Sequence, residues 1–401
     1  MNSSPFPNPQ FRTSVYLLSR LASKPYLRFA LGVRKTTIVG RDQLRDALAT
    51  PYPLIFAFRH TAKEDGPVLL SSVRDTHLRF LYGRDVLYWA GKATQFLFPR
   101  LGFVAVQNRG TNRSGLQFLR DELAKPQFPL AMAPEGQVTY HMYRLSTMQP
   151  GIATMATWAM EATGGVTILP LAIGYCYERN TEQWIRGLLQ QWEEKTGLHT
   201  QGNTIEEMIS NAYHLMLQHI ANIFGLEDDR QETFPIRRDT LCEGLLALSE
   251  AEAGLPIGEG SIIDRLYRIR FAGSDTLFVR TSSDEEKEAA RSYLRKNQIV
   301  DLLEYLDPAY LQGAHHSGRA AESVLNLLDL ENRLQGGTID TRYSPTGKHA
   351  FLQLGEAMTF TSSKEIQMGR KTQQRQLLIS VREALQSCSE TLEGILMRAS
   401  G

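Results

Sequence analysis

Short apolar runs alternate with stretches of helical periodicity along the first half of the chain. The runs begin at residues 53, 101, 128 and 166, and glycine, proline or charged residues end each of them. A continuous apolar run bounded by turn residues is typical of a strand buried on both faces, and helices between such runs favour parallel pairing. Residues 36–40 are predicted to form a strand that precedes these four runs in the sequence. The pattern therefore indicates an α/β fold with a mixed, largely parallel sheet flanked by helices.

Helical spacing dominates after Tyr177. Trp184, Leu188 or Leu189, and Trp192 mark one amphipathic stretch, and residues 205–220 mark a second. A chain of 401 residues exceeds the usual size of one core, so about two domains are expected. We expect an N-terminal segment at 1–34, an α/β catalytic domain at 35–232 and a mainly helical domain of unknown role at 233–401. Within the last region, helices are predicted at 240–252, 260–271, 283–305, 320–334 and 364–396, and a short strand at 350–354.

The N-terminal segment carries only positive charge. The first forty residues contain six basic residues and no Asp or Glu, and Phe11, Val15, Leu18 and Leu21 recur at helical spacing. We expect this stripe to lie on an anionic membrane surface, which attracts basic residues by about 1 kcal/mol each. Two alternatives stay open: the stripe packs on the catalytic core, or the segment is an organelle transit peptide, which would place the protein in an organelle stroma.

Composition restricts the class of protein. Apolar content of 42% and a formal net charge of +1 describe a globular protein without the basic excess that a nucleic-acid partner requires. Cys176, Cys242 and Cys388 are far apart and have no metal or redox spacing, which suits a reducing compartment such as the cytoplasm. The most apolar long stretch, residues 151–175, contains Glu161, two glycines and a proline, so we expect no membrane-spanning helix.

A histidine and a carboxylate follow the strand predicted at 53–59. His60 and Asp65 cannot share one face of a helix, because five residues turn it by about 500°. His60 must therefore precede the helix, and Asp65 must lie at its start. The carboxylate can then accept the Nδ1 proton and leave Nε2 free to take a proton from a hydroxyl. The alternative is that Asp65 only caps the helix that begins near Gly66-Pro67.

Two further strand ends carry charged residues. Arg109 follows the run that begins at Leu101, and Glu135-Gly136 form a turn after the run that begins at Phe128. Together with His60, Asp65 and the apolar segment around Pro170, this order of blocks resembles the glycerolipid acyltransferase superfamily over about residues 35–180. Two departures are visible: Gln137-Val138-Thr139 stand where the family has Thr or Ser followed by Arg, and the arginine-bearing block is one residue longer.

The resemblance implies transfer of a fatty acyl group from an acyl carrier protein or coenzyme A thioester to a hydroxyl of lysophosphatidic acid or glycerol 3-phosphate. His60 and Asp65 would form the catalytic dyad, and Arg109, Glu135 and Gly136 would bind the acceptor. We expect no metal and no bound cofactor, because the thioester is already activated. The expected partners are the donor, the glycerolipid acceptor and a membrane surface, which would make the protein peripheral.

Two alternatives follow from the same residues. Acylation of a non-phosphorylated alcohol fits the missing arginine after Gly136, because that arginine in the family helps to hold a phosphate. A catalytically idle adaptor that keeps the fold and binds a membrane or a protein partner through its helical half is a different class of function.

Overall fold

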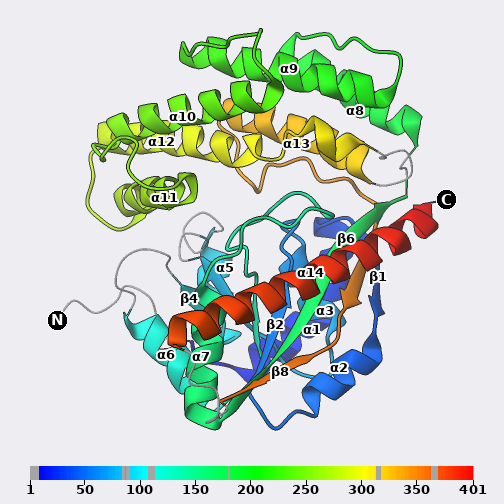
Figure 1. Ribbon diagram of the computed structural model, residues 1–401, viewed down its shortest axis with the longest axis vertical. Helices are drawn as coiled ribbons and strands as arrows, with labels where there is room; N and C mark the ends of the chain where they lie inside the picture. Colours follow the sequence, from blue (N-terminus) through cyan, green and yellow to red (C-terminus); the bar gives the residue numbers. More distant parts are fainter. Residues whose placement is uncertain are drawn as a thin grey trace. The chain divides into compact units, whose positions relative to one another are not determined.

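The computed structural model describes residues 9–83, 86, 91–106, 113–178, 181–312, 318–362 and 369–400. The chain divides into two compact units, of which unit 1 comprises Met1–Glu178 and Ser344–Gly401, and unit 2 comprises Arg179–Tyr343. Unit 1 is α/β with a mostly parallel mixed sheet, and unit 2 is helical (Figure 1). The predicted fold class is confirmed at this level.

The sheet of unit 1 has eight strands within the described residues, in the order β1-β7-β6-β2-β5-β3-β4, with β8 paired to β6. The described pairs are parallel except for those of β6 with β7 and β8. The carboxyl ends of the parallel strands β2 and β5 therefore lie at one edge. The strands are β1 (Val33–Val39), β2 (Leu54–Phe58), β3 (Arg79–Gly83), β4 (Val104–Val106), β5 (Leu130–Met132), β6 (Gly165–Tyr177), β7 (Lys348–Leu354) and β8 (Met358–Thr361).

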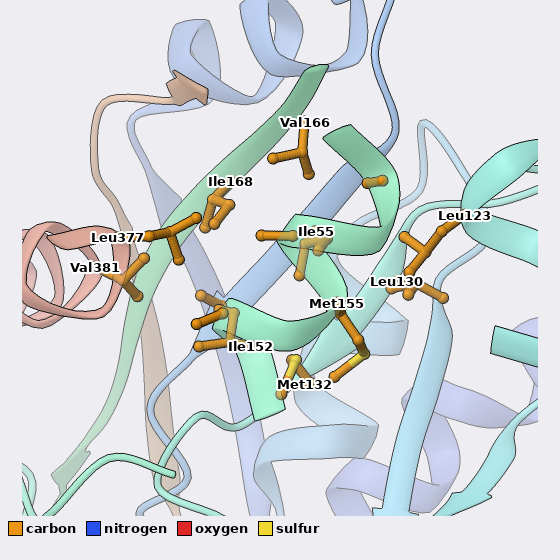
Figure 2. Packing of buried hydrophobic residues seen from close by; sticks show 14 of the residues in the cluster. Ile55, Leu123, Leu130, Met132, Ile152, Met155, Val166, Ile168, Leu377 and Val381 are labelled. Carbon is orange, nitrogen blue, oxygen red and sulfur yellow. The ribbon is translucent and has the colours of Figure 1, made fainter. Parts of the chain in front are cut away.

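Helices α7 (Gly151–Thr163) and α14 (Arg370–Ser400) bury one face of this sheet. Figure 1 shows α14, in red, crossing the strands, and Figure 2 shows Leu377 and Val381 of α14 facing Ile168 of β6. Side chains alternate along β2, so Ile55 and Ala57 enter this core whereas Phe56 and Phe58 point to the opposite face. The other helices of unit 1 are α1 (Thr13–Pro25), α2 (Arg41–Leu48), α3 (Asp65–Ser72), α5 (Gly91–Arg100) and α6 (Arg113–Ala124).

The two units do not follow the predicted division at residue 233. Residues 344–401 belong to unit 1, because β7 pairs with both β1 and β6 and because α14 packs on the sheet. The helical stretches at 184–192 and 205–220 belong to unit 2 instead of the α/β domain. Helical periodicity predicts that a segment is a helix, but it does not say which sheet or bundle the apolar face will cover. The division at 35–232 and 233–401 is therefore corrected.

The N-terminal stripe is only partly packed. The Phe11 ring lies 4.8 Å from that of His77 and 4.7 Å from that of Phe128, so this end of the segment is anchored on unit 1. Leu18 and Leu21 on α1 are instead 66% and 77% exposed. A π-helical turn at Tyr26–Ala30 follows, in which Phe29 is 82% exposed. Packing on the catalytic core, one of the two alternatives for this stripe, thus holds for Phe11 but not for Leu18 and Leu21.

Unit 2 is a bundle in which four of the described α-helices begin at a Ser or Thr side-chain cap, whereas those that begin at Phe234 and Arg319 do not. At Ser283 the hydroxyl accepts from the Glu286 N–H and the Glu286 carboxylate accepts from the Ser283 N–H, and Thr204 with Glu207 does the same. The helices are α8 (Glu182–Thr196), α9 (Ile205–Phe224), α10 (Phe234–Glu252), α11 (Ile262–Phe278), α12 (Asp284–Leu303), the short 3₁₀ helix Pro308–Leu311 and α13 (Arg319–Leu334). Over the described part of the chain, no helix is both long and apolar enough to cross a membrane.

Candidate active site

His60 and Asp65 meet at the carboxyl end of β2. The strand ends at Phe58, and Asp65 is the first residue of α3. His60 Nδ1 lies 3.0 Å from Asp65 Oδ2. The His60 side chain is 26% exposed, whereas that of Asp65 is fully buried. The predicted geometry of the pair is found in the structure, and its catalytic role stays a prediction.

The Asp65 carboxylate does not cap α3. Oδ2 accepts from the backbone N–H groups of Thr61 at 2.6 Å and Ala62 at 2.8 Å, which precede the helix. The residue at the N-cap position is Glu64, and its side chain makes no capping hydrogen bond. The capping alternative is therefore wrong. Because an ionised carboxylate only accepts hydrogen bonds, His60 Nδ1 must carry the proton, which leaves Nε2 as the basic nitrogen of the neutral ring.

Tyr175 of β6 completes the environment of Asp65. Its hydroxyl donates to Asp65 Oδ1 at 2.5 Å, and the ring is buried in unit 1. Burial, followed by the charges of Asp65 and Glu64, raises the pKa of Tyr175 well above its ordinary value. The phenol thus stays protonated and acts as a donor at physiological pH.

Glu135 and Gly136 form the predicted turn after β5. Gly136 adopts φ +75°, a left-handed conformation that glycine tolerates best, and its N–H donates to the Ala133 carbonyl. Glu135 is buried, and its Oε1 accepts from the Ser146 N–H at 3.0 Å and from Arg59 at 3.4 Å. Within the described residues, Glu135 Oε2 has no hydrogen-bond partner. This oxygen is thus a buried hydrogen-bond acceptor without a partner in the described part of the chain.

Arg59 holds the segment after that turn against the strand end. Its guanidinium is fully buried and donates to the carbonyls of Met142 at 2.9 Å and His141 at 3.0 Å and to Ser389 Oγ of α14 at 3.2 Å. The Thr139 N–H in turn donates to the His60 carbonyl at 2.7 Å. Arg59 therefore joins β2, the loop after Glu135 and α14 next to His60.

A buried ion pair fixes the start of α3 to β7. Lys348 Nζ lies 2.6 Å from Glu64 Oε1, and Ser344 Oγ donates to the same oxygen at 2.5 Å. Lys348 Nζ also lies 5.8 Å from the centroid of the Tyr175 ring. The C-terminal part of the chain thus supplies a buried cation that contacts Glu64, next to Asp65 in the sequence, and lies over the Tyr175 ring.

The last of the predicted site residues is Arg109. Arg109 falls outside the described residues, as do His315 and His316. His214 contacts Arg237 and His219 lies near Glu331, both within unit 2. A search of the described part of the chain finds no group of three or more His, Cys, Asp or Glu placed to hold a metal ion.

Sequence reasoning did not identify Arg59, Tyr175 or Lys348 as parts of the site. Arg59 carried a signal, since a charge that directly follows a buried apolar strand needs buried partners. Tyr175 and Lys348 lie 110 and 284 residues from the carboxylates that they contact, so no local pattern marks them. No family model and no curated protein matches this chain. Any proposal for the function of this protein must therefore rest on the geometry of the residues around His60 and Asp65.

Proposed function

We propose that the protein is an O-acyltransferase that moves a fatty acyl group from an acyl carrier protein or coenzyme A thioester to a hydroxyl of a glycerolipid-type acceptor. The observation that carries the proposal is the His60–Asp65 pair, with a buried carboxylate on Nδ1 and a partly exposed imidazole at the carboxyl end of parallel strands. The arrangement favours a general base acting on the acceptor over an enzyme nucleophile.

The proposed reaction has two steps. His60 Nε2 takes the proton of the acceptor hydroxyl while its oxygen attacks the thioester carbonyl carbon. The tetrahedral intermediate then collapses, the C–S bond breaks, and the imidazolium returns the proton to the departing thiolate. Asp65 stabilises the imidazolium and fixes its orientation. A general base positioned in this way contributes about 10² to 10⁴ in rate.

Acceptor binding is proposed from the resemblance to glycerolipid acyltransferases. Glu135 Oε2 and the Gly136 turn would hold a glycerol hydroxyl, and Arg109 would bind a phosphate through its planar pair of donors. The second candidate, acylation of a non-phosphorylated alcohol, is favoured by one specific observation. Glu135 is paired with Arg59, and Gln137-Val138-Thr139 supply no cation beside it.

A substrate panel tests these candidates. Purified protein would be given long-chain acyl-CoA or acyl carrier protein with lysophosphatidic acid, glycerol 3-phosphate or a long-chain alcohol, and ester product would be measured by mass spectrometry. Ester formed only with phosphorylated acceptors supports the first proposal, and ester formed with the alcohol supports the second. Absence of any acceptor-dependent ester, with the protein folded, would leave the idle adaptor as the better account.

We further propose that unit 1 binds the membrane that supplies its substrates through α1 and the turn after it. Leu17, Leu18 and Leu21 on α1 and Phe29 beyond it are more than half exposed, and the first forty residues contain basic groups without a single acid. Exposed apolar groups beside basic ones suit shallow insertion into an anionic leaflet.

Vesicle sedimentation tests this location. The protein is expected to sediment with anionic vesicles at low salt and to be released at high salt. Salt ions screen the attraction between exposed charges, and the Debye length is already only about 10 Å at 0.1 M salt. Leu18→Ser/Leu21→Ser should weaken sedimentation. Ile257→Ser, which replaces an apolar residue of unit 2 that is also more than half exposed, should not. Equal sedimentation of the wild type and the α1 variant would refute the proposed surface.

A further inference from the structure

Tyr175 approaches the site from a different strand than the one that carries His60. It lies on β6, where it is paired with Ala350 of β7, and its hydroxyl reaches Asp65 across the sheet. None of the steps proposed above requires a phenol. The proposed steps therefore do not explain why the Tyr175 hydroxyl donates a hydrogen bond to the buried Asp65 carboxylate.

The two oxygens of Asp65 have different partners. Oδ2 receives His60 Nδ1 and the N–H groups of Thr61 and Ala62, and Oδ1 receives the Tyr175 hydroxyl. A carboxylate turns easily about its terminal bond, and a turn would take Oδ2 away from the imidazole. The Tyr175 bond holds Oδ1 and thereby opposes that rotation. We propose that Tyr175 is a positioning residue that acts through Asp65 to keep His60 in the Nδ1–H tautomer, an inference that rests on the proposed acyl transfer.

The surroundings keep Tyr175 itself in place. Its backbone N–H contacts Met142 Sδ at 2.9 Å, and the Lys348 ammonium lies over its ring. Burial raises the pKa of Tyr175 well above the ordinary value, which excludes it as a proton acceptor near neutral pH. The phenol can therefore fix the carboxylate without competing with His60 for the substrate proton.

Kinetics of Tyr175→Phe test the inference first. The variant removes one oxygen and keeps the ring, so kcat should fall about ten- to a hundredfold, with little change in the KM of either substrate. Tyr213→Phe is the matched control, because Tyr213 is a fully buried tyrosine of unit 2, and it should keep normal kcat. Replacement of Tyr175 by 4-aminophenylalanine restores a donor at the same place and should recover most of the rate.

Non-additivity separates positioning from a structural role. Since Tyr175 acts through Asp65, Tyr175→Phe should change kcat by less than about twofold when it is added to Asp65→Asn. A further loss of the same size as in the wild-type background would show that Tyr175 acts independently of Asp65 and would overturn the proposal.

The tautomer can be observed without any reaction. In protein labelled with ¹⁵N-histidine, the signals of His60 among the nine histidines are assigned by their loss in His60→Gln. At a pH where the ring is neutral, wild type should show His60 protonated on Nδ1, and Tyr175→Phe should show a smaller fraction of this form. An unchanged fraction in the folded variant would overturn the proposal. If the wild type transfers no acyl group, the proposed function fails, and this measurement still decides the role of Tyr175.

Discussion

Substitution of Glu64 by Gln should strongly destabilise unit 1. The Glu64 carboxylate and the Lys348 ammonium lie 2.6 Å apart, and each residue is 3% exposed. Glu64→Gln would leave the ammonium buried opposite a neutral amide. Removing one partner of a buried ion pair costs about 3–5 kcal/mol, because the remaining charge is uncompensated. We expect a loss of this size in the free energy of unfolding of unit 1, and a similar loss for Lys348→Met.

The double variant should be less destabilised than the sum of the two single ones. With both charges removed, the desolvation cost of each ion disappears, and replacing a whole buried pair is often close to neutral. The loss in the double variant should therefore fall short of the sum of the two single losses by at least the roughly 0.5–3 kcal/mol that is usual for residues in direct contact. Glu178→Gln is the control, since Glu178 pairs with Arg34 at the surface of the same unit and such pairs contribute about 0–1 kcal/mol.

The penalty should depend on pH in one direction. Burial opposes ionisation of Glu64, but the charge of Lys348 and the hydrogen bonds from Lys348 and Ser344 outweigh it, so the pKa of Glu64 is lowered from the ordinary 4.5. The stabilisation by this carboxylate is therefore complete above pH 4.5 and is lost as pH falls through the lower pKa of the folded state. The difference between wild type and Glu64→Gln should be constant near neutral pH and shrink in acid.

Urea unfolding followed by circular dichroism measures these differences, and hydrogen exchange of the β6 and β7 amides assigns the transition to unit 1. The reasoning would be refuted if Glu64→Gln cost less than about 1 kcal/mol at neutral pH, or if the two single losses added up in the double variant.

Two further predictions concern α14 and the cysteines. Leu385→Ala on α14 should lower the stability of unit 1 by about 2–5 kcal/mol, as for other buried leucines, and an effect below about 1 kcal/mol in urea unfolding would contradict the placement of α14 on the sheet. Burial raises the pKa of the Cys242 and Cys388 thiols to about 12, so iodoacetamide near neutral pH should alkylate Cys176 long before either of them. Mass spectrometry of the native protein checks this order, and early alkylation of Cys388 would contradict it.

Local geometry accounts for what the sequence predicts correctly. The strands β2 and β6 follow from apolar runs bounded by turn residues, which are typical of strands buried on both faces. The pairing of His60 with Asp65 follows from the angle that five helical residues would subtend, which forces the histidine out of α3. These inferences needed only neighbouring residues.

Tertiary partners decide the features that the sequence does not predict. The stripe Leu377, Val381 and Leu385 predicts a helix in α14, but the same stripe would suit the helical unit as well as the sheet. Strand β8 is short and none of its residues is fully buried. Its sequence therefore has no continuous apolar run of the kind that predicted the other strands. Tyr175 differs from any core tyrosine only through Asp65, which is remote in the sequence. A sequence pattern cannot report such a contact.

The proposed function depends most directly on His60. Wild type, His60→Ala and His199→Ala should be compared in a single-turnover assay of ester formation from a long-chain acyl thioester and the acceptor that the substrate panel identifies. His199 is an exposed histidine of unit 2, so its variant controls for the substitution itself. The account predicts that His60→Ala loses at least about 10² in rate while its thermal unfolding midpoint stays near that of wild type, and that His199→Ala keeps full activity. Near-normal ester formation by folded His60→Ala would contradict the account.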